Sequence, residues 1–448
     1  MGKGLPHLSP TEAVDIAHRI EAVWPDQARN NRIHRYVQGE HDLPFAPRSA
    51  RAAYRWLLDR SRTNWCRLLM QLLAQNLFVD GYRALGDDQA EEPLGWSHWQ
   101  INGLARRQAA VHRATLKYGW SYVTVLPGDT GPVIRGVSPR DMTAVYADEA
   151  DHWPLYALHR KTSWTPDGPR SVYRLFDDTA VYTLAENDPG QGPAYLDHAD
   201  HGLGVCPVVR FLDEDDLDAD SPGVVAPVLD IQDRLNYQTF LLMTTGEHGA
   251  HRQRWAAGLE LDEDEEPPIG PDRLLHSDSP ETRFGTFDST DMTGYVAVLE
   301  QILRHLAAIT QTPAWALHGS LSNLAADTID AADAGLQRRV GERKTSYGES
   351  WQQTLRLSCL AAGDEAGWLD TTAVVRWRDT STRSLAGVVD AWGKAVQMLD
   401  VPARATWERL PGVTDQDVRR WEQMPPALDG HALLADTLAR ATADPGGG

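Results

Sequence analysis

The chain has 448 residues, of which 42% are hydrophobic and 24% charged, and its formal net charge is -20 at pH 7. This length allows two or three folding units, and the acidic balance excludes a broad basic surface that would grip nucleic acid. No run of about 18 apolar residues occurs, so the sequence predicts no membrane span. The three cysteines lie far apart without CxxC spacing, which favours synthesis in a reducing cytosol.

Helical patterns dominate the start of the chain. Ser9, Pro10 and Glu12 form a capping box with proline at the first helical position, which predicts a helix start. Apolar residues at steps of three and four predict further helices. These helices cover 50–60, 64–77 and 104–118. We expect the second of them to stop near Gly81 and the third at Gly119.

The middle of the chain changes to short β-branched and aromatic runs that are separated by proline, glycine and aspartate. These runs predict strands over 121–126, 132–137, 142–146, 171–176, 180–184 and 207–212. We expect them to form antiparallel sheet.

An acidic run at 213–220 follows the last predicted strand, and Ser221 and Pro222 then predict the start of a helix. Carboxylates at alternate positions suit calcium. A calcium loop begun at Asp216, however, has Ser221 where an EF-hand needs glycine and Pro227 where it needs glutamate. We therefore interpret the run as a solvated linker whose charges compensate the helix N-terminus.

Two long helical patterns joined by a short loop are the most distinctive stretch of the chain. The first pattern carries a narrow apolar seam on one helix face. The seam consists of Met292, Tyr295, Leu299, Ile302, Leu306 and Ile309. The second pattern extends a similar stripe over about 35 residues, roughly 50 Å at 1.5 Å per residue. A helix this long with one apolar stripe is typical of large assemblies or of helices packed on symmetry copies.

Catalytic and phosphate-binding motifs are absent from the sequence. It contains no GxSxG, HExxH, GxGxxG or GxxxxGK[ST] segment, so we expect no enzyme activity and no cofactor. His198 and His201 are close enough to share a metal, but no third ligand with a recognisable spacing accompanies them. We therefore interpret them as surface histidines and predict no metal site. Asp141 and Asp148 are the only acidic pair that we consider as candidate catalytic carboxylates.

Six short blocks follow one another in an order that is more informative than any one of them. They are YVQGEHDLPF at 36–45, RTNWCRL at 62–68, VDGY at 79–82, LKYGWSYV at 116–123, DIQDRLN at 230–236 and AAITQTP at 307–313. With an apolar seam before the Pro/Gly/Asn loop and a long helix after it, this order resembles that of bacteriophage portal proteins, the head-to-tail connectors of tailed phages.

The resemblance implies an α+β portal-type protomer that assembles as a ring. Its expected parts are a mixed helix-and-strand wing, stem helices, a small clip, a long kinked helix and a helical crown. By position they fall at 1–220 (wing), 221–250 (first stem helix), 251–290 (clip), 291–311 (second stem helix), 312–326 (tunnel loop), 327–382 (long helix and returning wing strand) and 383–448 (crown and C-terminal tail). The clip is short for the family, with strand candidates only at 258–261 and 273–276.

The same resemblance implies a function and a set of partners. We expect a dodecameric ring at one capsid vertex of the virion, made in the cytoplasm of the bacterial host. The ring would be a conduit for packaging and ejection of double-stranded DNA, without sequence specificity and without a membrane partner. It would dock a large terminase ATPase and a head-tail adaptor and contact the major capsid and scaffolding proteins. An acidic channel wall fits this role, because few phosphate contacts let DNA slide.

Two sets of residues are the candidate sites of such a conduit. The tunnel loop would direct Trp315, Leu317 and His318 towards the channel axis, and a plain connector between helices is the alternative. The candidate residues of the loop are Thr312, Pro313, Trp315, Leu317, His318, Gly319, Ser320 and Asn323. Charged residues on the long helix would bridge subunits or line the channel, and the alternative is a solvated face with an Arg338 and Glu342 pair. These charged residues are Arg338, Arg339, Glu342, Arg343 and Lys344.

Two other classes of protein stay open on the sequence alone. A non-portal acidic scaffold or ligand-binding protein predicts a small particle in solution, whereas a portal protein predicts a closed ring with a central hole. An uncharacterised enzyme predicts measurable nucleotide turnover by the isolated chain.

Overall fold

The computed structural model of the protein describes residues 7–24, 27–44, 52–83, 93–148, 151–165, 168–186, 192–218, 220–250, 254–258, 280–286, 291–318, 326–380, 385–407, 410, 412–413, 415–422 and 424. Within these residues, no helix is both long enough and apolar enough to cross a membrane. The expected mixture of helices and antiparallel strands is confirmed.

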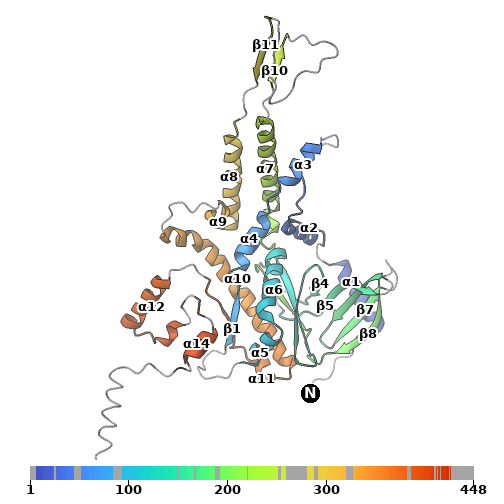
Figure 1. The fold of residues 1–448 in the computed structure, drawn as a ribbon. Coiled ribbons are helices and arrows are strands. Elements are labelled where there is room, and N and C mark those ends of the chain that lie inside the picture. Colours follow the sequence, from blue (N-terminus) through green and yellow to red (C-terminus); the bar gives the residue numbers. More distant parts are fainter. Residues whose placement is uncertain are drawn as a thin grey trace, which may run out of the picture.

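The molecule is elongated, with a mixed helix-and-strand body and a pair of long helices that projects from it (Figure 1). Helix α7 (Leu229–Ala250) leads away from the body and α8 (Thr293–Thr310) returns beside it. At the far end of the pair, β10 (Arg254–Ala257) pairs antiparallel with β11 (Arg283–Thr286). The strands predicted at 258–261 and 273–276 are not these two: Gly258 lies just after β10, and 259–261 and 273–276 lie outside the described residues.

Six described helices precede the first long sheet strands, and the third of them packs beside α7 of the projecting pair (Figure 1). They are α1 (Pro10–Ala22), α2 (Gln27–Gln38), α3 (Ala52–Arg60), α4 (Trp65–Ala74), α5 (Leu94–Ile101) and α6 (Leu104–Tyr118). The predicted capping box of α1 is confirmed, because the Ser9 side chain accepts from the Glu12 amide and the Glu12 side chain accepts from the Ser9 amide. The expected helix stop near Gly81 is wrong, since α4 ends at Ala74 and Gly81 lies inside a strand.

Among the described residues, three sheets belong to the body. Strands in the order β4-β5-β6-β7-β8 form a five-stranded sheet, β3-β2-β9 form a three-stranded sheet, and β1 pairs antiparallel with β12. Their bounds are β1 (Val79–Arg83), β2 (Trp120–Leu126), β3 (Val133–Val137), β4 (Met142–Val145), β5 (Tyr156–Thr165), β6 (Gly168–Phe176), β7 (Ala180–Glu186), β8 (Pro193–Asp200), β9 (Val208–Leu212) and β12 (Val374–Trp377). All six strands predicted for the middle of the chain are confirmed, whereas the sequence patterns did not predict β1, β5 and β8.

A long helix crosses the body and the remaining helices follow it. Helix α10 is continuous from Ala326 to Ala361 over 36 residues, and a kink in it stays a prediction. Shorter elements complete the chain: η1 (Ala226–Val228), α9 (Ala314–His318), α11 (Glu365–Leu369), α12 (Leu385–Leu399), α13 (Arg404–Trp407) and α14 (Asp415–Glu422). In Figure 1, α12 and α14 lie to one side of the body, on the side away from the five-stranded sheet.

The main core forms where α10 crosses the three-stranded sheet and the N-terminal helices. Trp351 of α10 is fully buried and makes edge-to-face contacts with Trp99 of α5 at 4.9 Å and with Phe211 of β9 at 4.8 Å between ring centroids. A second cluster lies under α1, where Ala13, Ala17 and Ile20 pack on the five-stranded sheet. Burial of a side chain the size of Ile20 contributes about 1.5–3 kcal/mol and each alanine methyl about 0.8 kcal/mol, so these contacts help to fix α10 and α1 to their sheets.

Two glycines lock the end of α6 against the segment that leads into α7. Gly119 has φ 102°, and a Cβ atom there would lie 2.0 Å from the Ser221 carbonyl oxygen. Gly223 has φ 66°, so the chain is not helical at that point. The helix predicted to start at Ser221 and Pro222 therefore begins later, as η1 at Ala226 and α7 at Leu229.

Candidate functional site: the connection between α8 and α10

Helix α8 buries one face and exposes another. Leu303 and Leu306 are buried in the main core, and Leu299 and Ile302 of the predicted seam pack against it. The other members of the seam behave differently. Tyr295 is half-buried, Met292 is 38% exposed and Ile309 is 60% exposed. The seam is therefore not one buried stripe within a single subunit, because its two ends face solvent.

The C-terminal end of α8 is closed by a network of hydrogen bonds. Gln311 adopts a left-handed conformation with φ 47°, and the Thr312 amide donates to the Ala307 carbonyl at 3.0 Å. The Thr310 hydroxyl donates to the Leu306 carbonyl at 2.7 Å. Arg339 of α10 donates a guanidinium N–H to the Thr310 carbonyl. A cation at a helix C-terminus is favourable, so Arg339 both satisfies a free carbonyl and stabilises the helix dipole.

The residues after α8 fold back on the body in the described subunit. Thr312 and Pro313 are buried, and Leu317 belongs to the main core with 6% exposure. Trp315 is half-buried and donates its indole N–H to Asp333 of α10 at 3.1 Å. Leu317 therefore does not project from the loop in this conformation, because an apolar side chain beside a core gains about 2 kcal/mol by joining it. The direction of Trp315 relative to a channel stays a prediction.

The other residues of the predicted loop carry less information. His318 is the last residue of α9. Gly319, Ser320 and Asn323 lie outside the residues that the structure describes. Their place at a channel stays a prediction.

Arg343 lies in a buried ion-pair network, the anchor network, which consists of Asp213, Glu214, Arg339, Arg343 and Tyr347. Its guanidinium donates from Nε and Nη2 to the two carboxylate oxygens of Asp213, at 2.7 and 2.8 Å, and from Nη2 to Glu214 at 3.0 Å. The Tyr347 hydroxyl donates to Asp213 at 2.8 Å. The side chains of Arg343 and Asp213 are fully buried. The prediction that Arg343 bridges subunits or lines the channel is therefore wrong, because its charge is paired inside its own subunit.

The interpretation of Asp213 as part of a solvated linker is also wrong. Asp213 follows directly after β9, and its amide donates to the Gly119 carbonyl at 2.8 Å. Burial raises the pKa of the Asp213 carboxyl, and Arg343 and the Tyr347 hydroxyl offset part of that shift. Burial works against the charged form of Arg343 too, but Asp213 outweighs it and the pKa of Arg343 is raised. Bidentate, charge-assisted contacts thus hold the end of β9 to the middle of α10.

Arg339 extends the anchor network to the end of α8. Besides its contact with Thr310, it lies 3.8 Å from Glu214, and its carbonyl accepts from Arg343 at 3.2 Å. Burial and the nearby Arg343 charge lower the pKa of Arg339 from its ordinary value. One set of polar contacts therefore joins β9, α10 and the C-terminal end of α8.

The remaining charged residues of the predicted set differ in exposure. Lys344 is half-buried, burial lowers its pKa, and its Nζ donates to the Arg378 carbonyl at 3.3 Å. Arg338 and Glu342 are exposed, and these two described side chains form no ion pair with each other. Of the five charged residues, Arg338 and Glu342 are thus the ones that stay open to a neighbouring subunit or to a channel.

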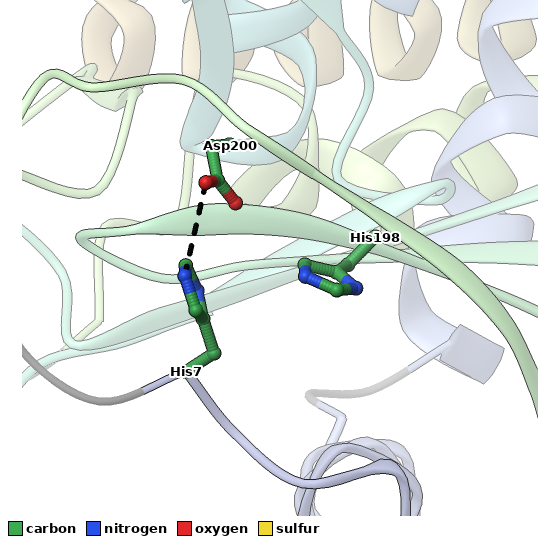
Figure 2. A group of neighbouring side chains, drawn as sticks. All are labelled: His7, His198 and Asp200. Atoms are coloured by element: carbon green, nitrogen blue, oxygen red, sulfur yellow. Dashed lines mark ion pairs between the residues drawn. The ribbon is translucent and has the colours of Figure 1, made fainter.

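The two histidines singled out in the sequence lie in different surroundings. His201 is buried and its Nε2 lies 3.1 Å from the Asp177 carbonyl oxygen, so the prediction of a surface histidine is wrong for it. His198 is exposed, as expected. It lies beside His7 and Asp200 instead of His201, in a cluster that the sequence analysis missed (Figure 2).

A mixed body, a projecting antiparallel helix pair tipped by a hairpin, and a 36-residue helix that crosses the body are the parts expected of the portal class of phage proteins. The chain belongs to the family described as "Phage portal protein, SPP1 Gp6-like", whose model matches residues 17–425.

Individual relatives are similar over most of their length. The portal proteins of Mycobacterium phages D29 and L5 are each 25% identical to the chain over 417 residues, covering 85% of this chain and 82% of theirs. Two solved structures are similar at 13% identity with a TM-score of 0.46. One is the neck of an empty gene transfer agent (GTA) particle, covering 90% of this chain and 96% of that one, and the other is the virion of a native GTA particle, covering 92% and 100%.

Proposed function

We propose that this portal family member forms a closed ring of about twelve copies at one capsid vertex and acts as the conduit for double-stranded DNA during packaging and ejection. In this proposal α7 and α8 are the stem helices, the β10–β11 hairpin belongs to the clip, and 312–326 is the tunnel loop. The large terminase ATPase and the head-tail adaptor dock on the ring, and the major capsid and scaffolding proteins surround it.

The observation that supports the ring most directly is the exposed apolar side of α8. Val298 and Ile309 lie eleven residues apart, which is about three helical turns, so they share one side of the helix. They are 49% and 60% exposed in the single subunit. Exposed apolar side chains that share one side of a helix favour an interaction surface there. In a ring, the neighbouring copy would cover this side while α7 covers the other.

The charge of the chain supports a channel that does not hold DNA tightly. At -20 per copy, the ring surface repels a polyanion, so few counterions are released and the duplex slides. The same charge requires cationic contacts between neighbouring copies. Arg338, exposed on α10, is the candidate for such a contact, since Arg339 and Arg343 are engaged inside the subunit.

The family is a structural component of phage particles, and neither of the two relatives described above is named as an enzyme. We therefore assign no catalytic role to this chain. The energy for packaging comes, in this proposal, from the terminase ATPase.

The proposal is tested by the mass of the purified protein in solution, measured by light scattering, with negative-stain images of the same fraction. A mass of about twelve chains and ring-shaped particles with a central hole are expected. A stable monomer or dimer at every salt concentration would contradict the ring and favour a monomeric scaffold or ligand-binding protein.

A further inference from the structure

We propose that His7, His198 and Asp200 form a zinc site that clamps the segment before α1 onto β8. The three residues come from two parts of the chain that are almost 200 positions apart and meet on the outer surface of the five-stranded sheet (Figure 2). Among the residues that the structure describes, this is the one group of three or more His, Cys, Asp or Glu side chains whose ligand atoms converge.

The distances suit one small ion. One ligand atom from each residue lies within 4.8 Å of the others, and His7 Nε2 is 3.7 Å from Asp200 Oδ2. Ligand atoms around a tetrahedral zinc ion at about 2.0–2.1 Å are roughly 3.4 Å apart, so small side-chain rotations bring these atoms to bonding distance. Figure 2 shows the His7 and His198 rings and the Asp200 carboxylate on the same side of the sheet.

Neighbouring side chains orient the His198 imidazole and fix the backbone next to His7 before any ion binds. The Tyr195 hydroxyl is 2.7 Å from His198 Nδ1, which leaves His198 Nε2 free to bind metal. The buried Tyr182 ring stacks on His198, with centroids 5.9 Å apart, and its hydroxyl accepts from the Leu8 amide at 2.9 Å. Tyr182 therefore positions His198 and the residue next to His7 at once. Hydrogen bonds of this kind, from the residues around a metal ligand, fix the ring orientation and strengthen binding.

The types of ligand select the metal. Two imidazole nitrogens and one carboxylate oxygen match zinc, whereas calcium and magnesium prefer sites made of oxygen atoms alone. All three side chains are exposed, so the fourth position is open to water. We assign this zinc site a structural role and not a catalytic one.

Zinc binding would stabilise the packing of α1 on the five-stranded sheet. Strand β8 is the edge strand of its sheet, and α1 packs across that sheet through the small apolar cluster of Ala13, Ala17 and Ile20. A metal ion bound by both His7 and the β8 residues ties the segment directly before α1 to the edge of the sheet. The ion binds the folded arrangement and not the unfolded chain, so it stabilises the packing of α1 on the sheet.

The experiment uses the full chain in its native assembly, stripped with EDTA and dialysed into metal-free buffer. Zn²⁺ alone is then added at micromolar concentrations, and bound zinc per chain is measured by equilibrium dialysis and elemental analysis. Matched variants are His7→Ala, His198→Ala and Asp200→Asn, with His152→Ala as an exposed-histidine control. Tyr195→Phe tests the orienting hydroxyl, which is a positioning group and not a ligand.

We expect about one zinc ion per chain and a higher melting temperature with zinc in the wild type and in His152→Ala. Loss of either histidine should weaken binding at least tenfold and abolish the zinc-dependent rise in melting temperature, while Tyr195→Phe should weaken binding about tenfold. The proposal is overturned if the wild type binds no zinc, or if His7→Ala and His198→Ala bind as much zinc as His152→Ala. Because the ligands are exposed, the variants fold, and their melting temperatures without zinc verify this.

Discussion

Replacement of Arg343 by methionine removes the cation of the anchor network while keeping a long side chain in the same space. Asp213 then loses two charge-assisted hydrogen bonds, and Glu214 and the Arg339 carbonyl lose one each. The Asp213 carboxylate is left buried, with the Tyr347 hydroxyl as its neighbour. The perturbation therefore creates an unpaired buried charge without opening a large cavity.

The expected loss is about 3–5 kcal/mol of folding free energy, the range found when one partner of a buried ion pair is removed. It depends on pH, because burial already raises the pKa of Asp213 and Arg343 no longer opposes that shift. The penalty is relieved progressively as pH falls below the raised pKa of the folded variant, because the folded variant then keeps Asp213 protonated. As pH rises towards that value, stability falls by about 1.4 kcal/mol per unit while the unfolded carboxyl is ionised.

The assay is thermal unfolding at fixed protein concentration, at pH 5 and pH 8. We expect Arg343→Met to melt roughly 3–5 °C below the wild type at pH 8 and to lose less at pH 5. Arg113→Met on α6 is the control, because it removes the same charge from an exposed position and should shift stability by less than about 0.5 kcal/mol. The double variant Asp213→Asn/Arg343→Met should recover at least half of the loss, since neither charge remains.

A loss no greater than that of Arg113→Met would refute the reasoning. So would a loss that is equal at pH 5 and pH 8, since the penalty would then not come from an ionised Asp213.

Three further predictions follow from other parts of the body. Burial lowers the pKa of His112 to about 4 and its Nε2 accepts from the Trp351 indole, so protonation of the unfolded chain should remove about 2 kcal/mol between pH 7.5 and pH 5. In urea unfolding, His112→Gln should lose less over that range, and an equal loss would contradict this. Gly119→Ala should lower the melting temperature far more than Gly103→Ala, because both glycines have positive φ but only the first new Cβ meets a backbone oxygen. Val298→Asp should leave circular dichroism unchanged yet reduce the particle mass in light scattering, and a full-sized ring would show that this side of α8 is not an interface.

The sequence predicted those parts of the fold in which local pattern and burial agree. The capping box at Ser9 and Glu12 is local chemistry, and α8 has clear 3.6-residue periodicity. Strands β5 and β8 were missed because their exposed faces carry polar and charged side chains, and β8 lies at a sheet edge. The helix start predicted at Ser221 and Pro222 is too early, because Gly223 has a positive φ and the helix begins after it.

The charges of the anchor network show why a site is harder to predict than a helix. The sequence alone indicates a surface charge at Arg343, because this residue lies among other charged residues. Its position between Val340 and Tyr347, within the apolar stripe of α10, was the signal that it faces the core. Its partner Asp213 is 130 residues earlier, and only the fold shows that the two meet.

The cluster of His7, His198 and Asp200 is hard to predict for the same reason, because its members meet only in the fold. The sequence alone predicts no metal site, because no third ligand lies at a recognisable spacing from His198. The residue that lies beside it, His7, precedes α1, and the packing of α1 on the five-stranded sheet brings it there. No spacing rule connects positions so far apart.

The central claim, that this chain forms a ring whose channel is lined at its narrowest point by the connection between α8 and α10, is tested most directly by a single-particle reconstruction of the purified assembly. The account predicts a closed ring with residues 312–326 at the constriction and with Val298 and Ile309 covered by the neighbouring copy. A ring that carries this connection on its outer surface, or the absence of any closed ring, would contradict it.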